Sequence, residues 1–300
     1  MRSLLLGLML LSPTLSNAAD WPTWRFDSNR SASSPTDLSK TLHLQWTRHY
    51  HALKPAWAED PRIHFDASYE PIVVGKLMFV ASSRRDSVVA LSTDTGKEQW
   101  RFFTDGPVRF APVADKDRLY LASDDGHVYC VQAKDGSLIW KHNALPSRRK
   151  VIGNERLIPA WPLRGGPVLQ DGRIHVTVGV WPFEGTFLCT LDAKTGKPIN
   201  PKTGLSGMQA LKRLSPQGYL VTSENRLFLP CGRARVYCLD RVSGAPISHK
   251  ADSRGKTDYH AIAKGPWLFH GHRVHHMVKN VTLPIIAPRP VVSDDRLYTG

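Results

Sequence analysis

The sequence predicts an all-β protein built from a repeated small sheet. Among the 300 residues, 22 are glycine and 22 are proline, and short alternations of apolar and polar residues lie between the turns that these residues indicate. A phrase also recurs: residues 90–100 read ALSTDTGKEQW and residues 130–140 read CVQAKDGSLIW, each with Gly in its seventh place and Trp in its eleventh. The alternation and the density of turns exclude a helical solenoid.

Extended backwards, the phrase closes a longer repeat unit. The unit runs through an apolar stretch, a turn such as Asp171-Gly172, an alternating strand, a second turn such as Asp125-Gly126 and a third strand. A turn with Gly in a fixed place and a last strand follow. Successive fixed glycines are separated by 40, 60 and 48 residues, and units are recognisable from Pro71, Pro112, Pro167, Gly218 and Pro290.

Four strands in about 40–45 residues is the size of one propeller blade. We therefore predict a β-propeller of four-stranded blades, with about four to five blades in this chain, the last of which stops in mid-blade. A β-sandwich is the structural alternative, but it would not repeat a fixed phrase. The propeller is expected to occupy residues 20–300.

The repeated Trp is expected to join neighbouring blades. An indole between two blades would bury about 150–250 Å² and would donate its N–H to a carbonyl of the adjacent turn. Residues 42–46, LHLQW, are expected to form an extra outer strand that helps to close the ring. The predicted structural docking motif comprises Ala90, Gly96, Trp100, Gly136, Trp140, Gly196 and Gly244.

Residues 1–19 predict a signal peptide. Arg2 precedes an apolar core from Leu4 to Leu11, and small residues follow up to Ala19. A buried N-terminal strand is the alternative. We expect an exported protein, periplasmic or extracellular and associated with the cell envelope, without a transmembrane segment. The four cysteines are expected to be mostly buried thiols, with Cys231–Cys238 as the one disulfide to test.

The formal net charge is +14, which raises the question of a polyanionic partner. The basic residues are scattered, their one tight run is Arg148-Arg149-Lys150, and no nucleic-acid-binding motif accompanies them. The sequence therefore disfavours a nucleic-acid partner and leaves anionic polymers of the cell envelope as the better match.

Two segments outside the repeat are candidate partner-binding sites. In the insertion at 141–166, Trp161 and Arg164 would combine a stacking surface with an anion-binding group, unless the loop only packs against the next blade. At 178–187 a longer loop replaces a tight turn, and Trp181, Phe183 and Glu184 at its tip would contact a partner. The alternative is that these aromatic rings fold onto their own blade.

A third segment, residues 259–277, is rich in histidine. His270, His272, His275 and His276 are candidate metal ligands, since His270 and His272 would share one face of a strand. Surface histidines on an irregular pair of strands are the alternative.

The phrase ALSTDTGKEQW resembles the docking motif of the pyrroloquinoline-quinone (PQQ) repeat family, whose pattern is roughly A-x-D-x-x-x-G-K-x-x-W. Ala90, Gly96, Lys97 and Trp100 match, whereas Ser92 stands where Asp is usual; Asp192 and Asp240 fill that place in later units. The opening DWPTWRFDSNRSASSP also resembles exported members of this family. The resemblance implies a propeller, which occurs both in PQQ- and calcium-dependent dehydrogenases and in cofactor-free assembly proteins.

Features typical of the dehydrogenases are absent from this sequence, which favours the assembly-protein function. The adjacent cysteine pair of the dehydrogenases and the C-x-x-C-H haem motif do not occur in these 300 residues, and no acidic residues map onto their calcium ligands. We therefore expect a non-catalytic binding or assembly scaffold without a cofactor, with a protein or envelope polymer bound on the loop-bearing face. The alternative is a PQQ- and calcium-dependent quinoprotein oxidoreductase that acts on alcohols or sugars. The sequence makes no prediction of the oligomeric state.

Overall fold

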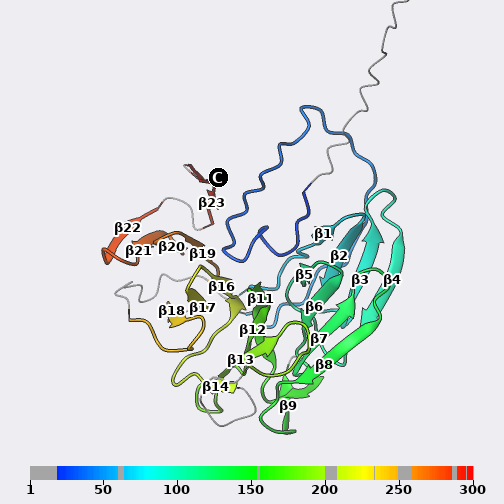
Figure 1. The fold of residues 1–300 in the computed structure, drawn as a ribbon. Helices are drawn as coiled ribbons and strands as arrows, with labels where there is room; N and C mark the ends of the chain where they lie inside the picture. The colour runs from blue at the N-terminus through cyan, green and yellow to red at the C-terminus, as the bar shows by residue number, and fades with distance from the viewer. Residues whose placement is uncertain are drawn as a thin grey trace, which may run out of the picture.

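The computed structural model describes residues 19–59, 64–153, 156–199, 208–232, 234–248, 259–285, 289–294 and 296–299. These residues form β-strands and no helix, so the all-β prediction is confirmed. Small sheets follow one another in chain order around an arc (Figure 1). Within the described ranges no helix could cross a membrane. Of the predicted signal peptide, all but Ala19 lies outside these ranges.

The first two sheets are antiparallel meanders that match the units beginning at Pro71 and Pro112. One has the order β1-β2-β3-β4 and the other β5-β6-β7-β8. Gly96 and Gly136 lie in the turn before the last strand of each, with φ of +67° and +74°, a conformation that favours glycine. The strands are β1 (Ile72–Val74), β2 (Leu77–Ser82), β3 (Ser87–Ser92), β4 (Glu98–Phe103), β5 (Val113–Asp115), β6 (Arg118–Ala122), β7 (His127–Gln132) and β8 (Leu138–Asn143).

The insertion at 141–166 forms a separate two-stranded hairpin, β9 (Lys150–Gly153) and β10 (Arg156–Pro159). The next sheet has the order β14-β13-β12-β11-β15, in which β15 runs parallel to β11. A three-stranded sheet of β16, β17 and β18 follows. The strands are β11 (Leu163–Gln170), β12 (Arg173–Val178), β13 (Phe187–Asp192), β14 (Met208–Ala210), β15 (Gly218–Tyr219), β16 (Val221–Thr222), β17 (Arg226–Cys231) and β18 (Ala234–Asp240).

The histidine-rich segment was wrongly placed outside the repeat. It belongs to a four-stranded antiparallel sheet of β19 (Ala261–Lys264), β20 (Trp267–His270), β21 (Arg273–His276) and β22 (Val281–Pro284). The turns of this sheet contain Gly265-Pro266 and Gly271-His272 rather than Asp-Gly, and its last strand has no Trp. The final pair is β23 (Val291–Val292) and β24 (Leu297–Tyr298).

Tryptophan side chains join successive sheets by lying on the fixed glycines. A Cβ atom on Gly136 would lie 2.6 Å from Cε3 of Trp100, and the Trp100 Nε1 donates to the carbonyl of Ala133 at 3.1 Å. Trp140 lies on Gly196 in the same way and donates to Ala193 at 3.2 Å. The last strand of one sheet is thereby fixed to a turn of the next.

Trp46 makes the equivalent contact with the first sheet. Its ring lies on Gly96 and its Nε1 donates to the carbonyl of Thr93 at 2.7 Å. Residues 42–46 form no strand, so the predicted outer strand is wrong, and the connection to the sheet is made by the Trp46 side chain. At Gly244 the facing side chain is Gln209, whose Nε2 donates to the Gly244 carbonyl at 2.7 Å.

Residues 20–32, here called the N-terminal brace, contact the first strand of one sheet after another. Its backbone partners are Val73 in β1 for Trp21, Ala114 in β5 for Pro22, Thr222 in β16 for Ser28, Ala263 in β19 for Asn29 and Val292 in β23 for Ser31. The fully buried Arg30 donates to Pro167 in β11 and to Leu220, each at 3.0 Å. Since one short segment reaches all these strands, the first strands must converge around it.

The four cysteines are free and buried, as expected, and the tested pair Cys231–Cys238 forms no disulfide. Cys238 lies opposite Phe228 on the neighbouring strand, whereas Cys231 lies opposite Ala234. Burial raises the pKa of the Cys189, Cys231 and Cys238 thiols to about 12, which keeps them protonated and unreactive.

Candidate functional site

Predicted site residues contribute to a pocket of about 450 Å³. Three parts of the chain enclose it: the β9–β10 hairpin, the loop at 180–184 that follows β12, and residues 56–57. Four of the five predicted partner-binding residues line it, namely Arg164, Trp181, Phe183 and Glu184. Both departures from the repeat therefore contribute to the same cavity.

The loop at 180–184 presents its aromatic rings at the pocket mouth. Trp181 is 47% exposed and Phe183 is 82% exposed, and their rings lie 6.1 Å apart between centroids. Trp181 also meets Trp57 edge-on at 5.3 Å. The Trp57 Nε1 donates to Gln217 Oε1 at 2.6 Å, which fixes this ring. The rings are thus held from one side and open to a partner on the other.

Glu184 and Trp161 hold the loop in place. The Trp161 Nε1 donates to the Glu184 carbonyl at 2.9 Å. The carboxylate of Glu184 forms an ion pair with Arg149, whose guanidinium lies 5.1 Å from the centroid of the Trp161 ring. The arginine that stacks on Trp161 is thus Arg149, whereas the sequence had paired this ring with Arg164.

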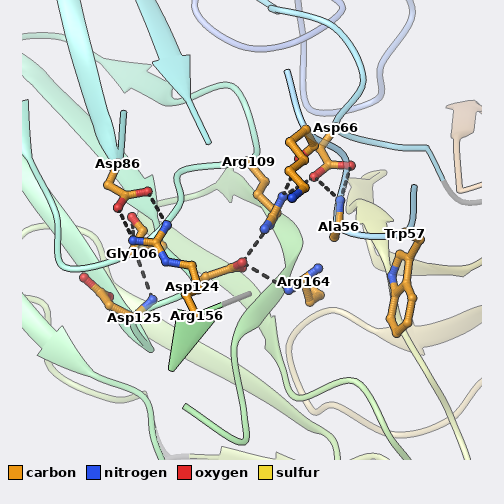
Figure 2. Close-up of polar contacts among 12 residues, drawn as sticks. Ala56, Trp57, Asp66, Asp86, Gly106, Arg109, Asp124, Asp125, Arg156 and Arg164 are labelled. Atoms are coloured by element: carbon orange, nitrogen blue, oxygen red, sulfur yellow. Dashed lines mark hydrogen bonds and ion pairs between the residues drawn. The ribbon is translucent and has the colours of Figure 1, made fainter. Parts of the chain in front are cut away.

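Arg164 belongs instead to a buried network of charges at the pocket floor (Figure 2). Its Nη2 lies 3.1 Å from Asp124 Oδ2, and the same oxygen accepts from Arg109 Nε at 2.6 Å. Arg109 Nη1 reaches Asp66 at 2.5 Å, and Asp66 accepts from the backbone N–H of Ala56 at 3.0 Å. Burial lowers the pKa of Arg164, and the charge of Asp124 opposes this effect. The network fixes Ala56 and Asp66 against the end of β6 and the start of β11.

A calcium ion of the kind used by quinoprotein dehydrogenases takes six to eight oxygen ligands, mostly carboxylates and carbonyls. Beside this pocket the buried carboxylates of Asp66 and Asp124 are each bonded to a guanidinium group. Two cations beside two carboxylates leave no excess negative charge for a divalent ion. The described residues around this pocket do not fit such a group.

The four candidate histidines lie around one turn of the β19–β22 sheet. His270 ends β20, His272 lies in the turn, and His275 and His276 lie in β21. His270 and His275 are buried, and the Nδ1 of His275 lies 2.8 Å from Thr282 Oγ1. In the described ranges, no three His, Cys, Asp or Glu side chains come together as metal ligands would.

Sequence reasoning missed Trp57, Arg149 and Ile152 among the residues that line the pocket. Ile152, near the tip of the hairpin, is 85% exposed. The available signal was composition: residues 151–152 are two consecutive apolar residues, Val-Ile, in an insertion outside the repeat. Trp57 lies between the brace and the first repeat unit, where the sequence has no periodic pattern that would indicate its position.

Comparisons with known proteins agree with this fold. Residues 23–160 match the family model described as Outer membrane protein assembly factor BamB. The quinone-dependent alcohol dehydrogenase subunit of Gluconobacter oxydans is 24% identical over 190 residues, which cover 59% of this chain and 24% of the relative. BamB of Moranella endobia is 31% identical over 129 residues, 39% of this chain and 29% of the relative. The chain spans about a quarter of the length of the curated relatives it matches.

Among solved structures, the quinohemoprotein alcohol dehydrogenase of Comamonas testosteroni is similar, with a TM-score of 0.55 and 18% identity. The match covers 87% of this chain and 47% of that protein, and it shows the fold alone. It supports the predicted propeller. The resemblance carried by the docking motif is confirmed, since residues 23–160 match the BamB family model and the chain is similar to BamB and to a quinone-dependent alcohol dehydrogenase subunit.

Proposed function

We propose that this chain is a non-catalytic scaffold of the cell envelope that binds a protein partner at the 450 Å³ pocket. The observation that carries the proposal is the exposed apolar surface around the pocket mouth. Ile152 is 85% exposed, Phe183 82% and Trp181 47%. Large apolar side chains gathered in one exposed place mark interaction sites more often than chance exposure does.

The geometry suits a protein segment with an apolar anchor and acidic flanks. Trp and Tyr rings at the edge of a pocket supply most of the energy of many protein interfaces. Arg148, Arg149 and Lys150 are exposed at the start of the adjacent hairpin, where they would attract acidic residues of a partner, and Arg149 lines the pocket. Because Glu184 is bonded to Arg149, the loop is already ordered, which lowers the entropic cost of binding.

The alternative is the quinoprotein oxidoreductase, which the likeness to the alcohol dehydrogenase subunit keeps open. The arginine-paired carboxylates beside the pocket argue against it. The relative BamB is by name an outer-membrane protein assembly factor, and the predicted signal peptide at residues 1–19 agrees with a place in the cell envelope. A binding function in the envelope therefore accounts for the pocket and for the sequence together.

A site-specific crosslinking experiment tests the proposal. A photo-crosslinking residue replaces Phe183 in the full chain, expressed in its own host, and the same residue replaces Phe103 in a matched control. Phe103 is also exposed, at 67%, but lies at the end of β4 outside the pocket. We expect one discrete protein adduct from position 183 and none from 103. The yield of the adduct from position 183 should fall several-fold when Ile152→Ser is added.

Equal adduct yields from both positions, or a yield from position 183 that does not change with Ile152→Ser, would overturn the proposed docking site.

The enzymatic alternative has its own assay. The purified full chain is mixed with PQQ and Ca²⁺, and quinone absorbance and dye-linked oxidation of alcohols are recorded. Tight quinone binding with turnover would establish the oxidoreductase and reject the scaffold.

A further inference from the structure

A second, smaller pocket lies on the first sheet, where residues 48–51 pass over strands β2 to β4. Its volume is about 120 Å³. The side chains that line it are strongly biased in charge. Four arginines and two histidines contribute to the wall, and no aspartate or glutamate does; the basic residues are Arg48, Arg84, Arg85, Arg101, His49 and His51.

Two of the arginines are held in fixed positions by a single carboxylate outside the wall. Glu98 accepts from Arg101 Nη2 at 2.6 Å and from Arg48 Nη2 at 3.4 Å. Arg101 Nη1 also donates to Ser87 Oγ at 3.2 Å, and Arg48 Nη1 donates to the Gly96 carbonyl at 3.0 Å. One negative charge therefore compensates two guanidinium groups, whose orientations are set by these bonds.

The other two arginines are not compensated by their neighbours. Arg84 and Arg85 are exposed in the turn between β2 and β3, and their side chains form no ion pair with any residue that the structure describes. The adjacent Asp86 is occupied, since it accepts from Arg156 Nη1 at 3.0 Å and from Nη2 at 2.6 Å (Figure 2). Four arginine side chains thus line a small cavity with one carboxylate nearby, and a cavity lined by one sign of charge concentrates its field.

Aromatic side chains complete the wall. The rings of Tyr50 and Tyr69 lie 4.7 Å apart between centroids, and the Arg48 guanidinium lies 5.6 Å from the Tyr50 ring. The Tyr69 hydroxyl donates to the carbonyl of His51 at 3.0 Å, which ties residues 49–51 to the sheet. The volume corresponds to about four water molecules at roughly 30 Å³ each. Such a volume has room for one small anion.

We propose that this pocket binds one sulfate or phosphate group. The guanidinium fork donates parallel hydrogen bonds to two oxygens of such a group, and several forks around one cavity complete its coordination. The anion comes either free from solution or as a substituent of an acidic polysaccharide. The site lies apart from the 450 Å³ pocket, so it stands whether or not a protein partner binds there.

Binding of inorganic sulfate, inorganic phosphate and dextran sulfate to the full chain tests the site, with neutral dextran as the reference ligand. Isothermal titration calorimetry at low ionic strength should show saturable binding of the three anions and none of neutral dextran. Arg84→Gln/Arg85→Gln should weaken anion binding about tenfold or more, as expected for the loss of charge-assisted hydrogen bonds. Both side chains are exposed, so the variant should keep its fold, and circular dichroism checks this.

The matched control removes the same charge elsewhere. Lys194→Gln/Lys197→Gln deletes two exposed cations from the turn after β13, and it should leave anion affinity nearly unchanged. Equal loss in both double variants, or no saturable binding of sulfate or phosphate, overturns the proposal. The affinity per sulfate group distinguishes the two sources. If dextran sulfate binds more tightly per group than free sulfate, and only when Arg84 and Arg85 are present, the polysaccharide is the source. Equal affinity per group assigns the free anion.

Discussion

The indole of Trp100 lies directly on Gly136, the fixed glycine of the next sheet. The closest ring atom would be 2.6 Å from any Cβ placed there. Gly136 has a φ of +74° and its turn carbonyl at Ala133 accepts the indole N–H. One glycine therefore meets two requirements, the turn conformation and the close approach of the ring. Trp46 on Gly96 and Trp140 on Gly196 repeat the relationship.

Gly136→Ala should destabilise the protein more than Gly172→Ala. Gly172 has nearly the same φ, +70°, but a Cβ there would meet no atom within 4 Å. Gly172→Ala measures the backbone strain alone, about 1–2 kcal/mol. Gly136→Ala adds the displacement of Trp100, which we expect to cost a further 1–3 kcal/mol or so. Urea denaturation of both variants gives the difference, and equal losses would mean that the indole moves away at no cost.

Arg30→Met should destabilise the protein by about 3 kcal/mol or more, because it leaves buried carbonyls without donors at about 1–3 kcal/mol each. Arg30 is fully buried and donates to Leu220, Trp24 and Pro167, all at 3.0 Å. Arg148→Met, on the surface, is the control and should change the free energy of unfolding little. Thermal and urea unfolding report both values; a mild loss for Arg30→Met would show that the brace contributes little to stability.

Asp124→Asn should cost about 3–5 kcal/mol, because it leaves two buried guanidinium groups with one carboxylate. The oxygen it alters lies 2.6 Å from Arg109 and 3.1 Å from Arg164. Arg164→Met in the same chain removes one surplus cation and should recover part of the loss. A double-mutant cycle measured by urea denaturation gives the coupling. If the two losses simply add, Asp124 and Arg164 do not stabilise each other.

Glu70 should make the protein less stable as the pH rises from 4.5 to about 7. Burial raises the pKa of this carboxyl from 4.5 to about 7, although the Tyr219 hydroxyl donates to it and Arg289 and Arg30 lie near. In that window the unfolded chain loses the proton while the folded chain keeps it. The stabilisation is complete below pH 4.5 and is lost by about pH 7, up to about 3 kcal/mol in total.

Glu70→Gln should remove this slope, and it should be more stable than the parent chain at pH 8. The measurement is the free energy of unfolding in urea at several pH values. Glu59→Gln, an exposed change of the same kind, is the control. Parallel curves for the parent chain and Glu70→Gln would contradict the raised pKa.

Local patterns predicted most of the sheets. Gly96, Gly136 and Gly196 lie in the turn before the last strand of a unit or before the equivalent segment. Each has a positive φ, a conformation that favours glycine, so the turns could be recognised from the sequence. The sheet at 261–284 was missed because its turns at Gly265 and Gly271 differ in sequence from those of the other units and because its four histidines were interpreted as metal ligands. A repeat unit whose turn residues differ from those of the other units does not match one fixed phrase.

Contacts between distant residues could not be predicted. The brace binds strands from Val73 to Val292 through its backbone, so its partners leave no pattern in its side chains. Trp46 precedes Gly96 by 50 residues, whereas Trp100 precedes Gly136 by 36, so the spacing within the repeat does not predict the first pair. For the candidate site, the aromatic loop at 180–184 was recognised because it breaks the repeat, whereas Trp57 and Ile152 join it only through the folded chain.

The N-terminal brace also sets an order of events during synthesis. Residues 20–32 leave the ribosome before every strand that they contact, and their most distant partner, Val292, emerges about 260 residues later. Most strands of a sheet are close in sequence and can pair as they appear, whereas the brace meets its last partner only when β23 has emerged. This early segment thus completes its contacts last, and an interrupted chain would expose it together with the unpaired strands around it.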